Sequence, residues 1–213
     1  MGFAYMADGE LDNRAKACKD VMKHLDYKVN KNQLGVALYA AYILEKKDNL
    51  RQIISVPAGQ GKSRIIVAII RLLASRKGSS SILTKVQVVY NHQQLLDQDR
   101  DKITRVCKNS DIRLTFTVPN RADPVIQMTD KELVIIDEAD HILLDRAVHF
   151  QNLRVTSLII GLTATLKEDL LDCEKGYVVD DLKFAYVDSN MTASIADRTP
   201  AVSCSMERFM SAE

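Results

Sequence analysis

Hydrophobic positions in the first 50 residues recur at helical spacing. Between Leu11 and Tyr27 the apolar residues stand three or four positions apart, as at Ala15, Cys18 and Met22. This spacing predicts one amphipathic helix. A second helix is predicted from about Gln33 to Lys47, with Asn30 or Asn32 as its N-cap. Residues 1–50 are therefore expected to form an N-terminal helical segment.

From Arg51 onward short apolar runs alternate with longer helical patterns. The runs predict strands at 52–56, 86–90, 113–118, 133–136, 157–162 and 182–187, and the intervening patterns predict helices at 63–75, 93–107, 140–151 and 167–173. Strands separated by helices need crossover connections, which favour a mainly parallel sheet with helices on both faces. We expect one three-layer α/β domain over residues 51–190 and a polar tail over 191–213.

Composition and charge narrow the possible functions. The 213 residues are 46% hydrophobic with a net charge of +1, which gives no support for a strongly basic coat but leaves room for a local basic stripe. No apolar run approaches the ~20 residues of a membrane span. The four cysteines are scattered without a C-x-x-C pair, which is typical of reduced thiols in a cytoplasmic or nuclear protein.

The segment Val56-Pro-Ala-Gly-Gln-Gly-Lys-Ser63 follows a predicted strand and opens a predicted helix. That is the setting of a phosphate-binding P-loop, although the strict pattern has glycine where Val56 stands. Gly59 and Gly61 would let backbone amides surround a phosphate, Lys62 would supply a positive charge, and Ser63 would offer a hydroxyl to Mg²⁺. The candidate nucleotide-binding residues are Ala58, Gly59, Gln60, Gly61, Lys62, Ser63 and Arg64. The alternative is a glycine turn with an incidental lysine.

Two carboxylates come directly after the apolar strand 133–136. In a parallel sheet this is the carboxyl end, where ligands bind and where the candidate P-loop also lies. Asp137 is suited to hold Mg²⁺, usually through water, and Glu138 is suited to orient and deprotonate an attacking water. The alternative is an acidic cluster that stabilises the start of a helix, a role that suits Asp140.

With both motifs the chain resembles the motor core of helicase superfamily two. The resemblance covers about residues 30–190, the first of that family's two RecA-like lobes, and implies a RecA-like P-loop domain that uses ATP and Mg²⁺ and acts on RNA or DNA. Asp137-Glu138-Ala139-Asp140 spells the DEAD motif, and 161–165 (GLTAT) is similar to the third motif. The resemblance implies catalytic roles for Lys62, Asp137 and Glu138, coupling roles for Thr163, Thr165 and His141, and adenine recognition by Gln33. The aromatic and proline companions of that glutamine are absent.

One branch of similar motors moves polypeptide rather than nucleic acid. The stretch DEADHILLDRA at 137–147 is similar to DEVDSILIDEA in SecA protein-translocation motors. The chain departs from SecA in its phosphate loop, AGQGKS in place of TGEGKT, and lacks room for the peptide-crosslinking insertion. A polypeptide substrate therefore stays open beside a nucleic acid.

The resemblance also implies a second RecA-like lobe, which supplies arginine fingers to the shared ATP site. Only 48 residues follow Thr165, too few for such a lobe. An arginine finger contributes about 10³–10⁵ in rate, so we expect this chain alone to bind ATP·Mg²⁺ and hydrolyse it slowly. Three explanations stay open: a fragment of a longer motor, a lobe supplied by a partner, or a shortened relative kept as a non-catalytic nucleotide-binding module.

Overall fold

The computed structural model describes most of the chain between residues 10 and 189. The described residues are 10–24, 28–46, 50–74, 85–108, 110–120, 123–128, 133–144, 148–154, 156, 158–164, 171–172, 176–179 and 182–189. The predicted tail at 191–213 lies outside them. The division into segments at residues 50 and 190 therefore stays a prediction.

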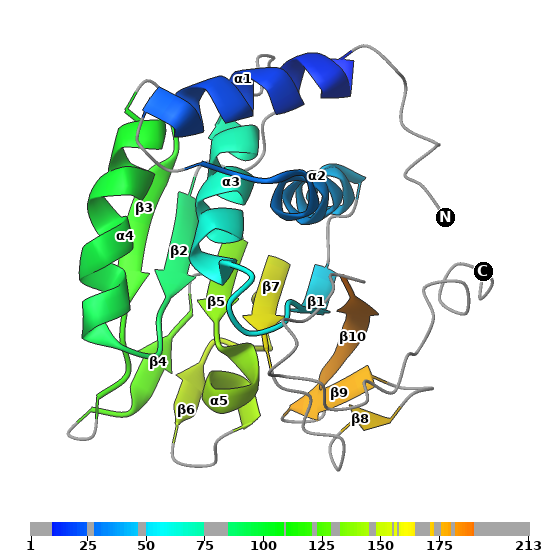
Figure 1. Cartoon of the computed structure of the whole chain (residues 1–213). Coiled ribbons are helices and arrows are strands. Elements are labelled where there is room, and N and C mark those ends of the chain that lie inside the picture. Colours follow the sequence, from blue (N-terminus) through cyan, green and yellow to red (C-terminus); the bar gives the residue numbers. More distant parts are fainter. Residues whose placement is uncertain are drawn as a thin grey trace.

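A single large sheet organises the described part of the chain (Figure 1). Six neighbouring strands run parallel and the last two are antiparallel additions at one edge. In spatial order they are β3 (Arg113–Thr117), β2 (Lys85–Val89), β5 (Leu133–Asp137), β7 (Leu158–Thr163), β1 (Leu50–Ser55), β10 (Leu182–Asp188), β9 (Gly176–Val179) and β8 (Leu171–Asp172). The predicted mainly parallel three-layer α/β fold is confirmed.

Helices and a small second sheet cover opposite faces of this large sheet. On one face lie α1 (Glu10–His24), α2 (Lys31–Lys46), α3 (Lys62–Ala74) and α4 (Gln93–Val106). On the other lie α5 (Ala139–Leu144) and the parallel pair β4 (Val125–Gln127) and β6 (His149–Gln151). Alternate strand residues enter the two cores: Ile54 packs with α1–α4, whereas Ile53 packs with α5. The period of two along each strand therefore builds the layers.

The central elements are buried because their sequences have no polar face. All five residues of β5 and all six of β7 are buried, as expected for a strand covered on both faces. In α3 every residue from Ile65 to Ile70 is buried, because α1, α2 and α4 surround its outer side. The helix predicted at 63–75, directly after the phosphate loop, is confirmed as α3.

One predicted helix is wrong in its second half, and another is contradicted where the structure describes it. The helix expected over 140–151 ends at Leu144, and His149–Gln151 form β6, paired in parallel with Val125–Gln127. Phe150 turns inward there between exposed neighbours, and local periodicity cannot reveal a partner strand more than 20 residues away. Within the helix expected over 167–173, Leu171–Asp172 form β8, which pairs with β9; the other residues of that range lie outside the described chain.

The strand order brings the two sequence motifs to one edge of the sheet. β7 lies between β5 and β1, with Asp137 level with Leu162 and Ser55 level with Thr163. The amide of Val56, at the start of the phosphate loop, donates to the carbonyl of Thr163 at 2.7 Å. The carboxyl ends of β1, β5 and β7 therefore form one ligand-facing edge. Among the described helices, none is long and apolar enough to cross a membrane.

Candidate functional site

The phosphate loop is a tight turn between β1 and α3. Gly59 and Gly61 have φ angles of 74° and 75°, which L-residues with side chains rarely adopt. The amide of Gln60 donates to the carbonyl of Pro57 at 3.2 Å, and the amides of Arg64 and Ile65 donate to the carbonyl of Gly61. Ala58 and Arg64 are exposed, whereas Gln60 and Ser63 are half-buried. The glycines thus permit a compact loop that ends at the amino terminus of a long buried helix.

Lys62 reaches across the sheet edge to the acidic motif. Its Nζ lies 2.9 Å from Oε1 of Glu138, and the two side chains are 12% and 25% exposed. Two segments 76 residues apart in sequence therefore meet in a half-buried ion pair. Ser63 follows in the first turn of α3, and the structure gives it no hydrogen bond to Asp137.

Asp137 is the last residue of β5 and is almost completely buried, with 2% of its surface exposed. Burial, together with the neighbouring charge of Glu138, raises its pKa from 3.8 to about 6, although Lys62 and a backbone amide lower it. Its Oδ1 atom is buried without a hydrogen-bond partner. A buried carboxylate oxygen without a partner is suited to a hard cation or its water ligand, so the residues at this edge fit Mg²⁺.

Glu138 occupies a left-handed backbone conformation, with φ of 53°. Such a conformation is strained for a residue with a side chain and is found at functional sites. Its carbonyl accepts hydrogen bonds from the amides of His141 and Ile142 at 3.0 and 3.1 Å, so Glu138 directly precedes α5 at the N-cap position. The sharp turn from strand to helix therefore leaves the Glu138 side chain beside Lys62.

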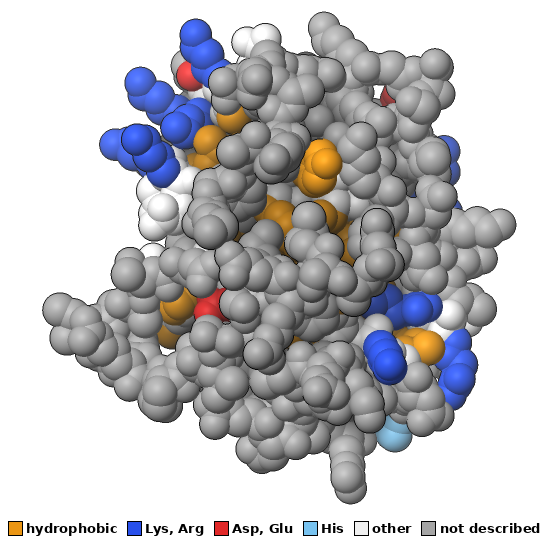
Figure 2. All heavy atoms as spheres, turned by 90° about the vertical axis from the view of Figure 1, so that its right-hand side faces the viewer, with side chains coloured by type: hydrophobic (Ala, Val, Ile, Leu, Met, Phe, Trp, Pro, Cys, Tyr) orange, Lys and Arg blue, Asp and Glu red, His pale blue; other side chains and the backbone are white. Residues whose placement is uncertain are grey.

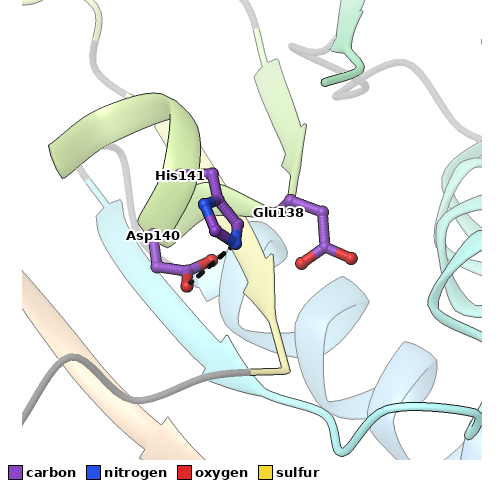
Figure 3. Close-up of side chains that lie close together, drawn as sticks. All are labelled: Glu138, Asp140 and His141. Atoms are coloured by element: carbon purple, nitrogen blue, oxygen red, sulfur yellow. Dashed lines mark ion pairs between the residues drawn. The ribbon is translucent and has the colours of Figure 1, made fainter. Parts of the chain in front are cut away.

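Asp140 links the acidic motif to the end of β7. Its Oδ1 accepts a hydrogen bond from the Thr163 hydroxyl at 2.5 Å, and its Oδ2 lies 3.9 Å from Nε2 of His141. Figure 3 shows the His141 ring between the carboxylates of Asp140 and Glu138. His141 is 54% exposed at this edge, whereas Asp140 and Thr163 are buried. Thr165 lies outside the described residues.

Glu138, Asp140 and His141 could together hold a metal ion, since each brings one ligand atom within 4.8 Å of the others. Two of these residues already have partners, because Glu138 pairs with Lys62 and Asp140 accepts from Thr163. A set with an imidazole also suits Mg²⁺ less well than an all-oxygen set. Asp137 is therefore the better candidate for Mg²⁺.

Gln33 belongs to the first turn of α2 and contacts the phosphate loop. Its Oε1 accepts from the Asn30 amide at 2.9 Å while Asn30 Oδ1 accepts from the Gln33 amide at 2.9 Å, which is a capping box. Its Nε2 donates to the carbonyl of Gln60 at 2.8 Å. A Cβ at Gly61 would lie only 2.7 Å from this Nε2. Both ends of the Gln33 amide thus bind the protein itself, and the pattern N-x-x-Q was the sequence signal for the cap.

Comparison with models of protein families shows the family to which the chain belongs. Residues 11–123 match the family described as type III restriction enzyme, res subunit, and this match covers just over half of the chain. The chain belongs to this family. The type III restriction enzyme res subunits form a family of helicase superfamily two, so the described domain is a helicase-type ATPase domain with a RecA-like fold. The matched segment contains all but the first residue of α1, the helices α2–α4 and the phosphate loop, and ends before the DEAD motif.

Comparison with solved structures gives a weaker likeness. One match is the Sulfolobus solfataricus SWI2/SNF2 ATPase core in complex with dsDNA, at 13% identity and a TM-score of 0.45. The alignment covers 66% of this chain and 33% of that one, so the chain spans about a third of the matched structure. No curated protein matches this member of the type III restriction family.

Proposed function

We propose that this chain is the ATP-binding first lobe of a nucleic-acid motor of helicase superfamily two. The observation that carries the proposal is the ion pair between Lys62 and Glu138, formed beside the partnerless Oδ1 of Asp137. A positive charge suited to phosphate, a carboxylate oxygen suited to a metal ion and a candidate general base therefore lie at one edge of the sheet. Membership of the type III restriction family supports the same function.

Each residue at the edge has a chemical role in this proposal. Amides around Gly59 and Gly61, at the positive end of α3, bind the phosphates, and Lys62 neutralises their charge. Ser63 and Asp137 hold Mg²⁺, which when bound neutralises charge on the phosphate oxygens. Glu138 orients and deprotonates the attacking water. Lys62 pairs with Glu138 in the structure, and in this proposal the lysine exchanges that anionic partner for a phosphate.

Turnover in this proposal requires a second RecA-like lobe. The described residues place the candidate site at an edge of one lobe, and an arginine contributed from another lobe is worth about 10³–10⁵ in rate. We therefore expect the chain alone to bind ATP and hydrolyse it slowly. The second lobe comes from the same protein or from a partner. If adding a second lobe does not increase ATP turnover, the chain is instead a non-catalytic nucleotide-binding module.

A polypeptide motor is the second candidate function. It is favoured by the stretch DEADHILLDRA at 137–147, which is similar to the corresponding segment of SecA. The fold does not discriminate, because the same lobe serves both kinds of motor. The substrate must therefore be found by its effect on ATP turnover.

Stimulated ATP hydrolysis tests both candidates in one assay. Turnover by the wild-type chain should rise when RNA or DNA is added with a second lobe, and should not rise with an unfolded polypeptide. Glu138→Gln should keep ATP binding and lose the stimulated turnover, because the amide cannot accept a proton from water. Stimulation by an unfolded polypeptide but not by RNA or DNA would establish the second candidate. If none of these polymers stimulates turnover, that result would contradict a motor function.

A further inference from the structure

A second buried carboxylate, on the helix α4, has no role in the site described above. It belongs to Asp99, which is 2% exposed, as is Asp137. Figure 2 shows basic side chains gathered in two places on one face of the molecule, with few acidic side chains visible among the described residues there. Asp99 and Asp137 instead carry their carboxylates inside the protein, where water screens charge least.

The register of β2 and β5 brings Asp99 toward Asp137. Val89 of β2 pairs with Ile136 of β5, so the next positions along the two parallel strands are Tyr90 and Asp137. Tyr90 is completely buried in the core beneath α1–α4, and the alternation along β5 puts Asp137 on the same face. The Tyr90 hydroxyl donates to Oδ2 of Asp99 at 3.1 Å. Tyr90 therefore joins the buried carboxylate of α4 to the strand position beside Asp137.

The electrostatics of Asp137 agree with this placement. Burial and the charge of Glu138 are the main causes that raise the pKa of Asp137, and the charge of Asp99 adds to them. The ammonium of Lys102 lies 3.9 Å from Oδ1 of Asp99, but the Lys102 side chain is 33% exposed, so water screens it more than the buried carboxylate. Asp99 therefore adds negative potential around Oδ1 of Asp137, the buried oxygen without a hydrogen-bond partner.

We propose that Asp99 is a positioning residue of the candidate ATP site, which strengthens Mg²⁺ binding at Asp137 without contacting the ion. A buried carboxylate attracts a nearby cation strongly, because charges interact over longer distances where water is excluded. The same charge repels the phosphates of ATP when no metal ion accompanies them. Asp99 therefore makes the site prefer Mg²⁺·ATP to metal-free ATP. This inference rests on the proposed function, since it takes Asp137 as the residue that holds Mg²⁺.

Nucleotide binding with and without Mg²⁺ tests this inference. The affinity of the full chain for a fluorescent ATP analogue is measured in excess Mg²⁺ and again in EDTA, and the first affinity divided by the second is called here the metal preference. Asp99→Asn keeps an oxygen that can accept from Tyr90 and removes the charge, so it should lower the metal preference by about fivefold. The affinity in EDTA should stay the same or rise. Asp101→Asn, an exposed change on the same helix, should alter both quantities much less.

A second variant changes the same potential from the surface of α4. Lys102→Gln removes the cation beside Asp99 and leaves every buried residue in place, so it should raise the metal preference, by about twofold. Arg105→Gln removes an exposed positive charge one turn further along α4 and should change the metal preference less. If Asp99→Asn does not fold, Lys102→Gln decides alone, and no rise in the metal preference would overturn the inference.

The outcomes separate an electrostatic role from a structural one and from the ATP site itself. If Asp99 only holds α4 in place, Asp99→Asn will weaken both affinities by the same factor, and the unchanged metal preference would overturn the inference. If Mg²⁺ does not raise the affinity of the wild-type chain for the ATP analogue, the proposed function is wrong, and the inference about Asp99 is wrong with it. A wild-type chain that prefers Mg²⁺·ATP, with an unchanged preference in folded Asp99→Asn, would contradict the role of Asp99 alone.

Discussion

Removing the Gln33 side chain should weaken nucleotide binding by loosening the phosphate loop, and not by removing a direct contact with the nucleotide. Gln33→Ala removes two hydrogen bonds of a side chain that is only 3% exposed, one to the Asn30 amide at 2.9 Å and one to the Gln60 carbonyl at 2.8 Å. At about 1 kcal/mol for each bond, the free energy of unfolding should fall by about 2 kcal/mol. Of these two bonds, the one to Gln60 is the one that contacts the loop, so its loss should weaken nucleotide binding by about fivefold.

The choice of nucleotide makes this experiment decisive. Affinities for fluorescent ATP and GTP analogues should fall by the same factor, because the bond to Gln60 orders the loop whatever base is attached. Asn32→Ala, an exposed change in the same helical turn, should leave stability and both affinities unaltered. A loss of ATP affinity with GTP affinity intact would refute this reasoning and show that Gln33 reads adenine.

Two further substitutions probe the strands that flank the site. Burial holds the pKa of Asp137 near 6 in the folded state against 3.8 unfolded, so its contribution to stability is full below pH 3.8 and is lost as the pH rises through 6. Asp137→Asn should therefore raise the free energy of unfolding by up to about 3 kcal/mol at pH 7.5 and change it little at pH 3.5. Urea unfolding without Mg²⁺ measures both quantities, and an equal effect at the two pH values would contradict this reasoning. Gly161→Ala puts a Cβ 2.5 Å from that of Ala139 and should lower the free energy of unfolding by about 1–3 kcal/mol. The double variant with Ala139→Gly should recover part of this loss of stability. A Gly161→Ala protein as stable as the wild type would contradict this packing.

The layered fold and the site's location could be predicted because they depend on local patterns. Apolar runs such as 133–136 and 158–162 permit burial on both faces, and helices between them require parallel strands. Both sequence motifs follow strands, so both had to lie at the carboxyl edge of the sheet. Whether they are neighbours depends on strand order, and β7 between β5 and β1 is a long-range choice that no local pattern contains.

The features that could not be predicted from the sequence depend on contacts between distant segments of the chain. His149–Gln151 form a strand because Val125–Gln127 are available to pair with them, and β8 forms by pairing with β9. The bond from Gln33 to Gln60 joins residues 27 positions apart and depends on how α2 packs along α3. Tertiary pairing decided each of these features.

Calorimetric titration of ATP with Mg²⁺ tests the central claim most directly. Charge-assisted hydrogen bonds contribute about 1.5–3 kcal/mol, so Lys62→Ala should weaken ATP binding by at least tenfold, while the exposed change Lys108→Ala should not alter it. Unchanged ATP affinity in a folded Lys62→Ala protein would contradict the assignment of this sheet edge as a nucleotide site.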